Sequence, residues 1–335
     1  MKKLPARDRA DGALWGLFLG DAIAMPVHWY YDRAALLRDY GEVRDLVAPR
    51  NPHPGSILHR SHYSPPDLDS DILHDQARFW GREGVHYHQF LAAGENTLDL
   101  QLARLALSTI AEAGRYDPDR YLDRMVAFLR DPDSHRDTYV EEWVRGFFEN
   151  RARGIPLRKC GVKEKHIGGL AGPIAVLVAL HGDPGAAREA ARVHLDLTHK
   201  GPIMEAALEG VADVLQPVLA GTPLCEAIDA ARRSGNRYLA GDFSKWEARD
   251  DLEVIGRILS PACYVEDSVP AVIHLGRKYA GEPEAGLVAN TMVGGDNCYR
   301  GAVLGALLGA ANGPEGWPLR WREGLLAKPV LPLGG

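Results

Sequence analysis

The sequence lacks the features that mark several large classes of protein. It holds four cysteines in 335 residues, Cys160, Cys225, Cys263 and Cys298, and no two of them form a CxxC pair. Such wide spacing disfavours a zinc site and, in a reducing compartment, a disulfide framework. No run of about 18 apolar residues is present, and the N-terminal residues have no apolar core of a secretory signal. We therefore expect a cytoplasmic protein with no membrane partner.

Positive charge is also in short supply. Lys and Arg number 39 against 45 Asp and Glu, which gives a formal net charge of −6. No basic stripe is available to follow a phosphate backbone, so nucleic acid is not expected as a partner. The remaining composition, 46 % hydrophobic, is that of an ordinary globular protein with a well-buried core.

Alternating, strand-like patterns are nearly absent, whereas apolar residues at helical spacing recur along most of the chain. Helices are predicted at 12–24, 97–114, 120–130, 139–154, 172–182, 184–198, 204–221, 223–235, 269–281 and within 293–313. The breaks between them are short and carry Gly, Pro or Asp, as in a single helical domain with tight connections. Residues 45–75 are the exception, because this stretch is rich in Pro, His, Ser and Asp. We expect a long loop there, near a binding site.

Two of the predicted helices carry glycine on one face. Gly301, Gly305 and Gly309 recur every four residues near the C-terminus, and Gly12, Gly16 and Gly20 do so near the N-terminus. Gly costs roughly 1 kcal/mol per interior helix position relative to Ala, so these stripes indicate close approach by another helix. If the two helices cross each other, Asp21 and His28 lie near the turn at 296–298.

At these motifs the sequence resembles the ADP-ribosylglycohydrolase family. The family pattern GxxxGxxxGDAxxxPV stands at 12–27, and the pattern GGDxxxxGAxxGAxxGAxxG stands at 294–313. Further segments that resemble the family lie in the same order at 94–107, 165–176, 197–215 and 267–275. The resemblance implies one all-α domain over residues 1–335. It also implies that His199, in the Thr-His helix start, packs locally and is not catalytic.

The resemblance implies a second property, two magnesium or manganese ions that carboxylates hold against the ribose of a substrate. The carboxylate positions are largely changed here. The family's Thr-Asp-Asp-Thr run is matched to Gly94, Glu95, Asn96 and Thr97, its Asp-x-Asp-Thr run to Asp296, Asn297, Cys298 and Tyr299, and its glutamate after Pro-Val to His28. Because Mg²⁺ requires hard oxygen ligands in octahedral geometry, we expect no two-metal centre and no cofactor. Zinc held by His28, Cys298, Glu95 and Asp296 is the alternative.

The helix starts that carry these motifs are expected to line a pocket for a small molecule. Its substrate-binding residues are predicted to be Asp21, Trp29, Tyr30, Asn96, Asn297 and Tyr299, and its catalytic candidates Glu95, Asp296, Cys298 and His28. The residues that replace the family's carboxylates can donate or accept hydrogen bonds or act as nucleophiles. This favours a pocket with altered chemistry over one that has lost its function.

Three functions remain open for such a pocket. In the first, Glu95 or Asp296 is a general base on water and a glycosidic bond to a ribose-like sugar is hydrolysed without metal. In the second, Cys298 is a nucleophile, activated by the helix N-terminus and His28. In the third, the protein binds a ligand without turnover.

Six histidines surround the long loop. They are His53, His59, His62, His74, His86 and His88. Their scattered spacing argues against one metal site. We expect most of them on the solvated surface, with several at the mouth of the pocket.

Overall fold

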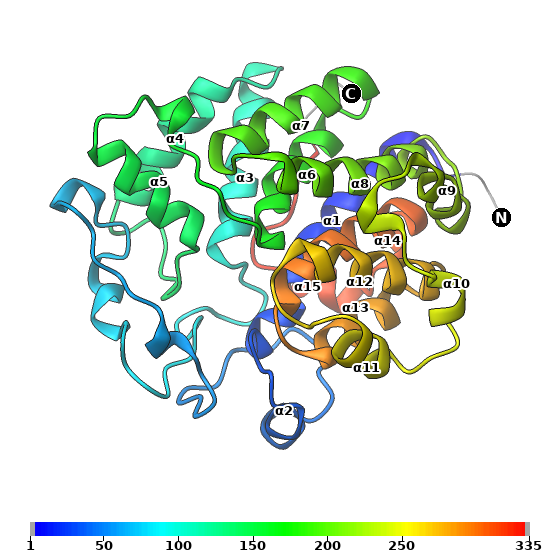
Figure 1. Cartoon of the computed structure of the whole chain (residues 1–335), viewed down its shortest axis with the longest axis horizontal. Helices are drawn as coiled ribbons and strands as arrows, with labels where there is room; N and C mark the ends of the chain where they lie inside the picture. The colour runs from blue at the N-terminus through cyan, green and yellow to red at the C-terminus, as the bar shows by residue number, and fades with distance from the viewer. Residues whose placement is uncertain (1–3, 332–335) are drawn as a thin grey trace.

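The structure, a computed structural model, describes residues 4–331. Fifteen α-helices are assigned within that range, joined by short turns (Figure 1). They are α1 (Ala6–Ala24), α2 (Arg33–Tyr40), α3 (Leu98–Ala113), α4 (Pro118–Arg130), α5 (Glu142–Ala152), α6 (Ala171–Ala179), α7 (Pro184–Thr198), α8 (Pro202–Leu219), α9 (Leu224–Ala231), α10 (Phe243–Trp246), α11 (Asp251–Glu253), α12 (Val265–Lys278), α13 (Pro283–Val293), α14 (Asn297–Asn312) and α15 (Leu319–Gly324). Strands are absent from the described residues, where only isolated bridges such as Val162 with His199 form.

The centre of the molecule is the pair α1 and α14. Both helices are apolar nearly all round, and from Gly16 onward every residue of α1 is buried, as is every residue of α14 up to Ala310. A helix without a polar face is stable only when other elements cover it on all sides. Figure 1 accordingly shows α1, in blue, and α14, in orange-red, side by side and enclosed by the remaining helices.

The glycine stripes are the contact between these two helices, as predicted. A Cβ added at Gly12 would meet the carbonyl oxygen of Gly309, one at Gly16 that of Gly305, and one at Gly20 that of Gly301. Backbone therefore lies against backbone over three turns. The prediction of a single all-α domain with its two ends in contact is confirmed.

Helix α13 is not predicted by the sequence pattern, because buried polar residues interrupt its apolar period. Asn290 donates from Nδ2 to the carbonyl of Asn297 at 2.8 Å and accepts from Arg300 Nε at 2.8 Å. Arg300 also donates to the carbonyl of Gly294. The polar face of α13 thus satisfies the turn that precedes α14 and fixes where α14 begins.

The stretch 45–75 is an irregular segment with two single turns of 3-10 helix, Leu58–Arg60 and Leu68–Ser70. Tyr63 fastens its end, since its hydroxyl donates to Asp71 Oδ1 at 2.8 Å and accepts from the N–H of Ile72 at 2.7 Å. The expected loop is present, and its proximity to a binding site remains a prediction. No helix within residues 4–331 combines the length and the apolar character that crossing a bilayer requires.

Candidate active site

The contact between α1 and α14 brings together residues from opposite ends of the chain. After α1, a single 3-10 turn (Met25–Val27) ends at His28, and α14 has Asp296 at its N-cap position. His28 Nε2 lies 3.1 Å from Asp296 Oδ1, and both side chains are inaccessible to solvent. The predicted approach of His28 to the 296–298 turn is therefore observed.

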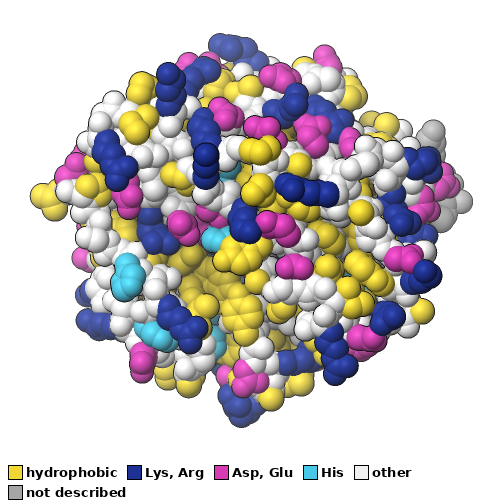
Figure 2. Space-filling view, in the orientation of Figure 1, with side chains coloured by type: hydrophobic (Ala, Val, Ile, Leu, Met, Phe, Trp, Pro, Cys, Tyr) yellow, Lys and Arg dark blue, Asp and Glu magenta, His cyan; other side chains and the backbone are white. Residues whose placement is uncertain are grey.

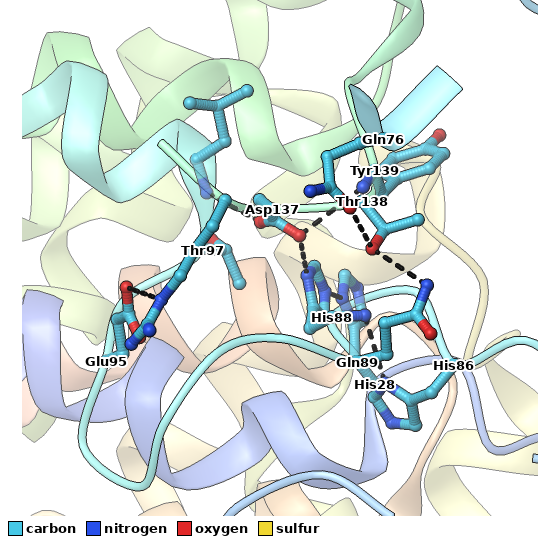
Figure 3. Close-up of polar contacts among 12 residues, drawn as sticks. His28, Gln76, His86, His88, Gln89, Glu95, Thr97, Asp137, Thr138 and Tyr139 are labelled. Carbon is cyan, nitrogen blue, oxygen red and sulfur yellow. Dashed lines mark hydrogen bonds and ion pairs between the residues drawn. The ribbon is translucent and has the colours of Figure 1, made fainter. Parts of the chain in front are cut away.

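A line of buried polar groups continues from this pair. His28 Nδ1 lies 2.7 Å from His88 Nε2, and His88 Nδ1 lies 2.7 Å from Asp137 Oδ1 (Figure 3). The other oxygen of Asp137 accepts the N–H of Leu98 at the start of α3. We call Asp296, His28, His88 and Asp137 the histidine chain; none of its four residues is exposed.

Aromatic rings hold the plane of His28. The Trp29 ring stacks on His28 with centroids 3.8 Å apart, and Tyr299 meets His28 edge-on at 5.2 Å. Trp29 has a left-handed backbone (φ 60°), and its N–H donates to the carbonyl of Gly295 at 2.8 Å. A non-glycine residue in that conformation is strained, and it persists only where the surrounding structure imposes it. The strain supports a role for Trp29 in orienting His28.

A second group of buried acids lies around Asp296. Burial, and then the charge of Glu141, raise the pKa of Asp99 well above its ordinary value. Burial likewise raises the pKa of Glu141, and the charges of Glu164 and Asp296 add to that effect. Carboxylates that raise one another's pKa in a dry interior are typical of sites that handle protons.

One cation offsets this acidic group. Burial would lower the pKa of His166, but its contacts with Cys263, Glu141 and Glu164 raise it. Glu164 also accepts the N–H of His166 at 2.7 Å, and its other oxygen lies 2.8 Å from His199 Nε2. Burial would raise the pKa of Glu164, but these histidines lower it to about 2. His166 and Glu164 therefore form a charged pair at neutral pH.

One oxygen of Asp296 has no partner. Its Oδ2 makes no hydrogen bond to any described residue, and its side chain makes no cap bond to α14. Burial raises the pKa of Asp296 to about 6, against the opposing effects of His166, Arg300 and the nearby N–H of Tyr299. Asp296 is therefore a buried carboxyl group that changes protonation near neutral pH and has one oxygen without a partner among the described residues.

Tyr31 and Cys263 lie near Asp296. Burial, followed by the charge of Asp296, raises the pKa of Tyr31, and the same two effects raise that of Cys263. Tyr31 is 46 % exposed, so it reaches the surface of the protein. Figure 2 shows hydrophobic side chains gathered in the middle of the face that it presents, bordered by a histidine and by acidic and basic groups.

Several predicted binding residues instead hold the fold together. Asp21 accepts hydrogen bonds from the Thr97 N–H and hydroxyl and from Asn96 Nδ2, and so joins α1 to the start of α3. Asn297 donates to the carbonyls of Val27 and Thr291. These contacts give Asp21, Asn96 and Asn297 structural roles, and substrate contact by them stays a prediction.

Tyr30 also has partners within the protein. Its hydroxyl donates to Asp39 at 3.3 Å and its ring stacks on His53 at 3.8 Å. Cys298 is fully buried; burial and then the charges of Asp21 and Asp296 raise its pKa well above the ordinary value. A protonated, enclosed thiol is a weak nucleophile.

The structure places Glu95 apart from this group, contrary to the pairing with Asp296 that the sequence suggests. Its carboxylate binds Arg136 (Nη2 to Oε2, 2.5 Å) and accepts the N–H of Ala92. It lines a separate cavity of about 450 Å³ beside Arg104 and Phe128. Figure 3 likewise draws Glu95 and its contact away from the histidine chain.

We expect Glu95→Gln to retain nearly full turnover. The variant removes a largely exposed ion pair with Arg136, which is worth about 1 kcal/mol or less. Turnover and thermal melting of the purified variant check this. A loss of turnover of about 100-fold with unchanged melting would restore Glu95 to the catalytic group.

Sequence reasoning missed the acids and histidines that complete the site. His88 and Asp137 carried no motif, and the expectation of mostly exposed histidines is wrong for His53, His86 and His88, which are buried. Asp99 did carry a signal. If the Thr-Asp-Asp-Thr run is set on residues 97–100, where α3 begins, Thr97 and Asp99 both match it. His199 contacts Glu164 in addition to its local partner Thr198.

The residues present do not fit the two-ion centre of magnesium or manganese. Within residues 4–331, His28, His88 and Cys298 form the sole group that brings three potential ligand atoms within 4.8 Å of one another. The carboxylates Asp99, Glu141 and Asp296 are not so gathered. Nitrogen and sulfur are poor ligands for Mg²⁺.

Comparison with known proteins agrees with this fold. A sequence model of the ADP-ribosylglycohydrolase family matches residues 2–332. A solved structure titled "ADP-ribosylglycohydrolase-related protein complex" is 22 % identical, with a TM-score of 0.64, over 97 % of this chain and 94 % of that one. No curated protein sequence matches the chain.

The family match over nearly the whole chain indicates a hydrolase of the glycohydrolase type. The chain belongs to the ADP-ribosylglycohydrolase family.

Proposed function

We propose that the protein hydrolyses a glycosidic bond of a small ribosyl or nucleoside-related molecule, and that it does so without a magnesium or manganese pair. The observation that carries the proposal is Asp296, whose Oδ2 has no partner among the described residues and whose pKa burial raises to about 6. A general acid or base works best when its pKa lies near the operating pH.

Asp296 is the proposed general base. Its Oδ2 takes a proton from a water molecule, the water oxygen bonds to the anomeric carbon of the sugar, and the bond from that carbon to the leaving group breaks. Asp296 then returns the proton to the leaving atom, so that one water is consumed per bond. No step in this sequence uses a metal ion.

The surroundings suit a sugar next to a flat ring. Tyr31 and Tyr264 are 46 % and 44 % exposed, and Tyr264 lies beside His166 with ring centroids 5.4 Å apart. Aromatic faces bind planar groups, and the acids Asp99 and Glu141 can accept hydrogen bonds from hydroxyl groups. Basic and acidic side chains are mixed over this face in Figure 2, which is consistent with a small-molecule substrate.

The alternatives make different predictions on one panel of ribosylated and nucleoside substrates. Loss of turnover in Asp296→Asn supports the proposed base. Full turnover in Asp296→Asn together with loss in Cys298→Ser would favour the thiol mechanism instead. Binding of a ribosyl ligand with no turnover in the parent protein would favour a non-catalytic relative.

We expect turnover to survive chelation, and magnesium and manganese to bind weakly or not at all. The described residues do not gather the oxygen ligands that a two-ion site needs. Calorimetric titration with each ion and assays in excess chelator check this. Tight binding of two ions per chain, or loss of turnover on chelation that added Mg²⁺ restores, would contradict it.

A further inference from the structure

The histidine chain has three internal contacts and, with neutral rings and ionised acids, too few protons to make them all. The contacts join Asp296 to His28, His28 to His88, and His88 to Asp137. Two neutral imidazoles bring two N–H groups. If each ring donates to its own carboxylate, the facing nitrogens of His28 and His88 are both acceptors, 2.7 Å apart. A third proton, or a metal ion in its place, is therefore needed if all three contacts are to be attractive.

The geometry between the rings suits a proton. The ring planes differ by 3° and the centroids are 5.0 Å apart, which is the sum of the 2.7 Å contact and two ring half-widths. The two nitrogens thus face each other on one line, as in an N–H···N hydrogen bond. A tetrahedral zinc ion with Zn–N bonds of about 2.0–2.1 Å needs nitrogens roughly 3.3 Å apart. Cys298 completes the one nitrogen and sulfur ligand set found within residues 4–331, but the two rings would have to separate before a zinc ion could bind there.

With three protons, the chain has two arrangements in which every contact is a hydrogen bond and both rings are neutral. In one, the proton is on Asp296, both rings carry theirs on Nδ1, and Asp137 is ionised. In the other, both rings carry theirs on Nε2, Asp137 is protonated and Asp296 is ionised. A shift of three protons by one contact each converts one into the other.

The backbone favours the first arrangement below about pH 6, where Asp296 is protonated. Asp137 accepts the N–H of Leu98 at 3.0 Å and that of Tyr139 at 3.4 Å, whereas Asp296 Oδ2 accepts none. Hydrogen bonds to a carboxylate stabilise its ionised form. The negative charge therefore rests on Asp137.

We propose that His88 and Asp137 are positioning residues of the reaction, which with His28 pass a proton to and from Asp296 and so set whether it meets the substrate as an acid or a base. This inference rests on the proposed function for its catalytic part. The proton arrangement itself is a property of the resting protein.

Other charged and titratable groups face the chain. They are Asp21, His86 and Cys298 near His88, Arg300 and Cys298 near His28, and His166, Arg300, Glu164, Glu141 and Tyr31 near Asp296. Arg300 is on α14, which begins directly after Asp296, and His86 lies two residues before His88. The tests below therefore compare variants within one background, where these groups are constant.

The first experiment is NMR of the protein labelled with ¹⁵N at histidine, which reports the protonated nitrogen of each ring without a substrate. His28→Gln and His88→Gln assign the signals. We expect both rings neutral and both protonated on Nδ1. Opposite tautomers, with His28 protonated on Nε2 and His88 on Nδ1, or a doubly protonated ring, would overturn the proposal.

The second experiment is the pH dependence of kcat in Asp137→Asn. Because the variant removes a negative charge from the chain, Asp296 ionises more easily and the acid limb moves to lower pH by about 1. We expect kcat to fall and KM to change little. His274 and Asp251 provide a control pair outside the site, in which Nε2 of the buried His274 lies 3.2 Å from Oδ1 of the partly buried Asp251. Asp251→Asn should leave the pH profile unchanged.

The outcomes separate the two proposals. Matching tautomers in a protein that turns over no substrate would support the proton arrangement and contradict the proposed function. A shift of the acid limb in Asp137→Asn and not in Asp251→Asn supports the positioning role, and an unchanged profile overturns it. One zinc per chain, retained in Cys160→Ser and lost in Cys298→Ser, would show that a metal and not a proton joins the rings.

Discussion

We expect turnover to fall by about 100-fold or more in Asp296→Asn. We also expect this variant to fold and, at pH 8, to melt at a higher temperature than the parent protein. The amide keeps the size of the carboxylate and its contact with His28 but cannot accept a proton from water. Loss of a general base of this kind costs on the order of 10²- to 10⁴-fold. Both readouts come from one purified variant, by steady-state assay and thermal melting.

The gain in stability follows from the sign of the pKa change. Burial raises the pKa of Asp296 from 3.8 to about 6, so the folded protein binds more protons than the unfolded chain between these values. The free energy of unfolding therefore falls as pH rises through that window, and the cost is fully present above pH 6. Asparagine removes a cost on the order of 2 to 3 kcal/mol at pH 8 and little at pH 3.

A purely structural role for Asp296 gives the opposite result. Loss of a helix cap costs about 0.5 to 2 kcal/mol, so a cap variant melts lower and keeps its turnover. The Asp296 side chain makes no cap bond to α14, which argues against that role. A lower melting temperature at pH 8 with full turnover would establish it, and Glu95→Gln serves as the control for a lost acid elsewhere.

We expect Gly16→Ala to destabilise the protein by about 3 kcal/mol or more, a large share of an ordinary total stability of about 5–15 kcal/mol. The new Cβ would overlap the carbonyl of Gly305 and crowd the Trp317 ring. Neither helix can move aside, because α1 and α14 are enclosed. Overpacking of a rigid core costs about 1–3 kcal/mol or more. Urea denaturation measures the change.

Gly276→Ala in α12 is the matched control. The added methyl group there would meet Leu304 and Leu307 at 3.7 and 3.8 Å, which is ordinary contact. Removing a helical glycine then stabilises by up to about 1 kcal/mol. If Gly16→Ala behaves like Gly276→Ala, the close contact between α1 and α14 is wrong.

The helical class and the meeting of the two chain ends follow from local signals. Glycine every fourth residue specifies which face of each helix approaches another, and the 12–27 and 294–313 patterns complete the pairing. Helix α13 was not predicted because two of its buried residues, Asn290 and Thr291, are polar and interrupt the helical spacing of apolar residues. The partners of the Asn290 side chain, Asn297 and Arg300, lie in α14, which a periodicity argument does not include.

The candidate site also has a part that could be predicted from the sequence and a part that could not. His28 and Asp296 could be placed together because each adjoins a glycine helix. His88 and Asp137 could not, since they come from irregular segments and meet only when His28 and α3 are in place. The predicted pairing of Glu95 with Asp296 does not form, because acids at neighbouring helix starts can point in different directions. Arg136 holds the Glu95 carboxylate away from Asp296.

The pairing of α1 with α14 also constrains how the chain is made. The central contact joins α1, at residues 6–24, to α14, at 297–312, so its two helices are far apart in sequence. Contacts this distant in sequence slow folding. Until α14 has been synthesised, the apolar α1 with its bare glycine face lacks that partner, and exposed surface of this kind makes a partly made chain prone to aggregation. Asp296 and His28 come together only when α14 packs on α1, so a chain without α14 also lacks the proposed site.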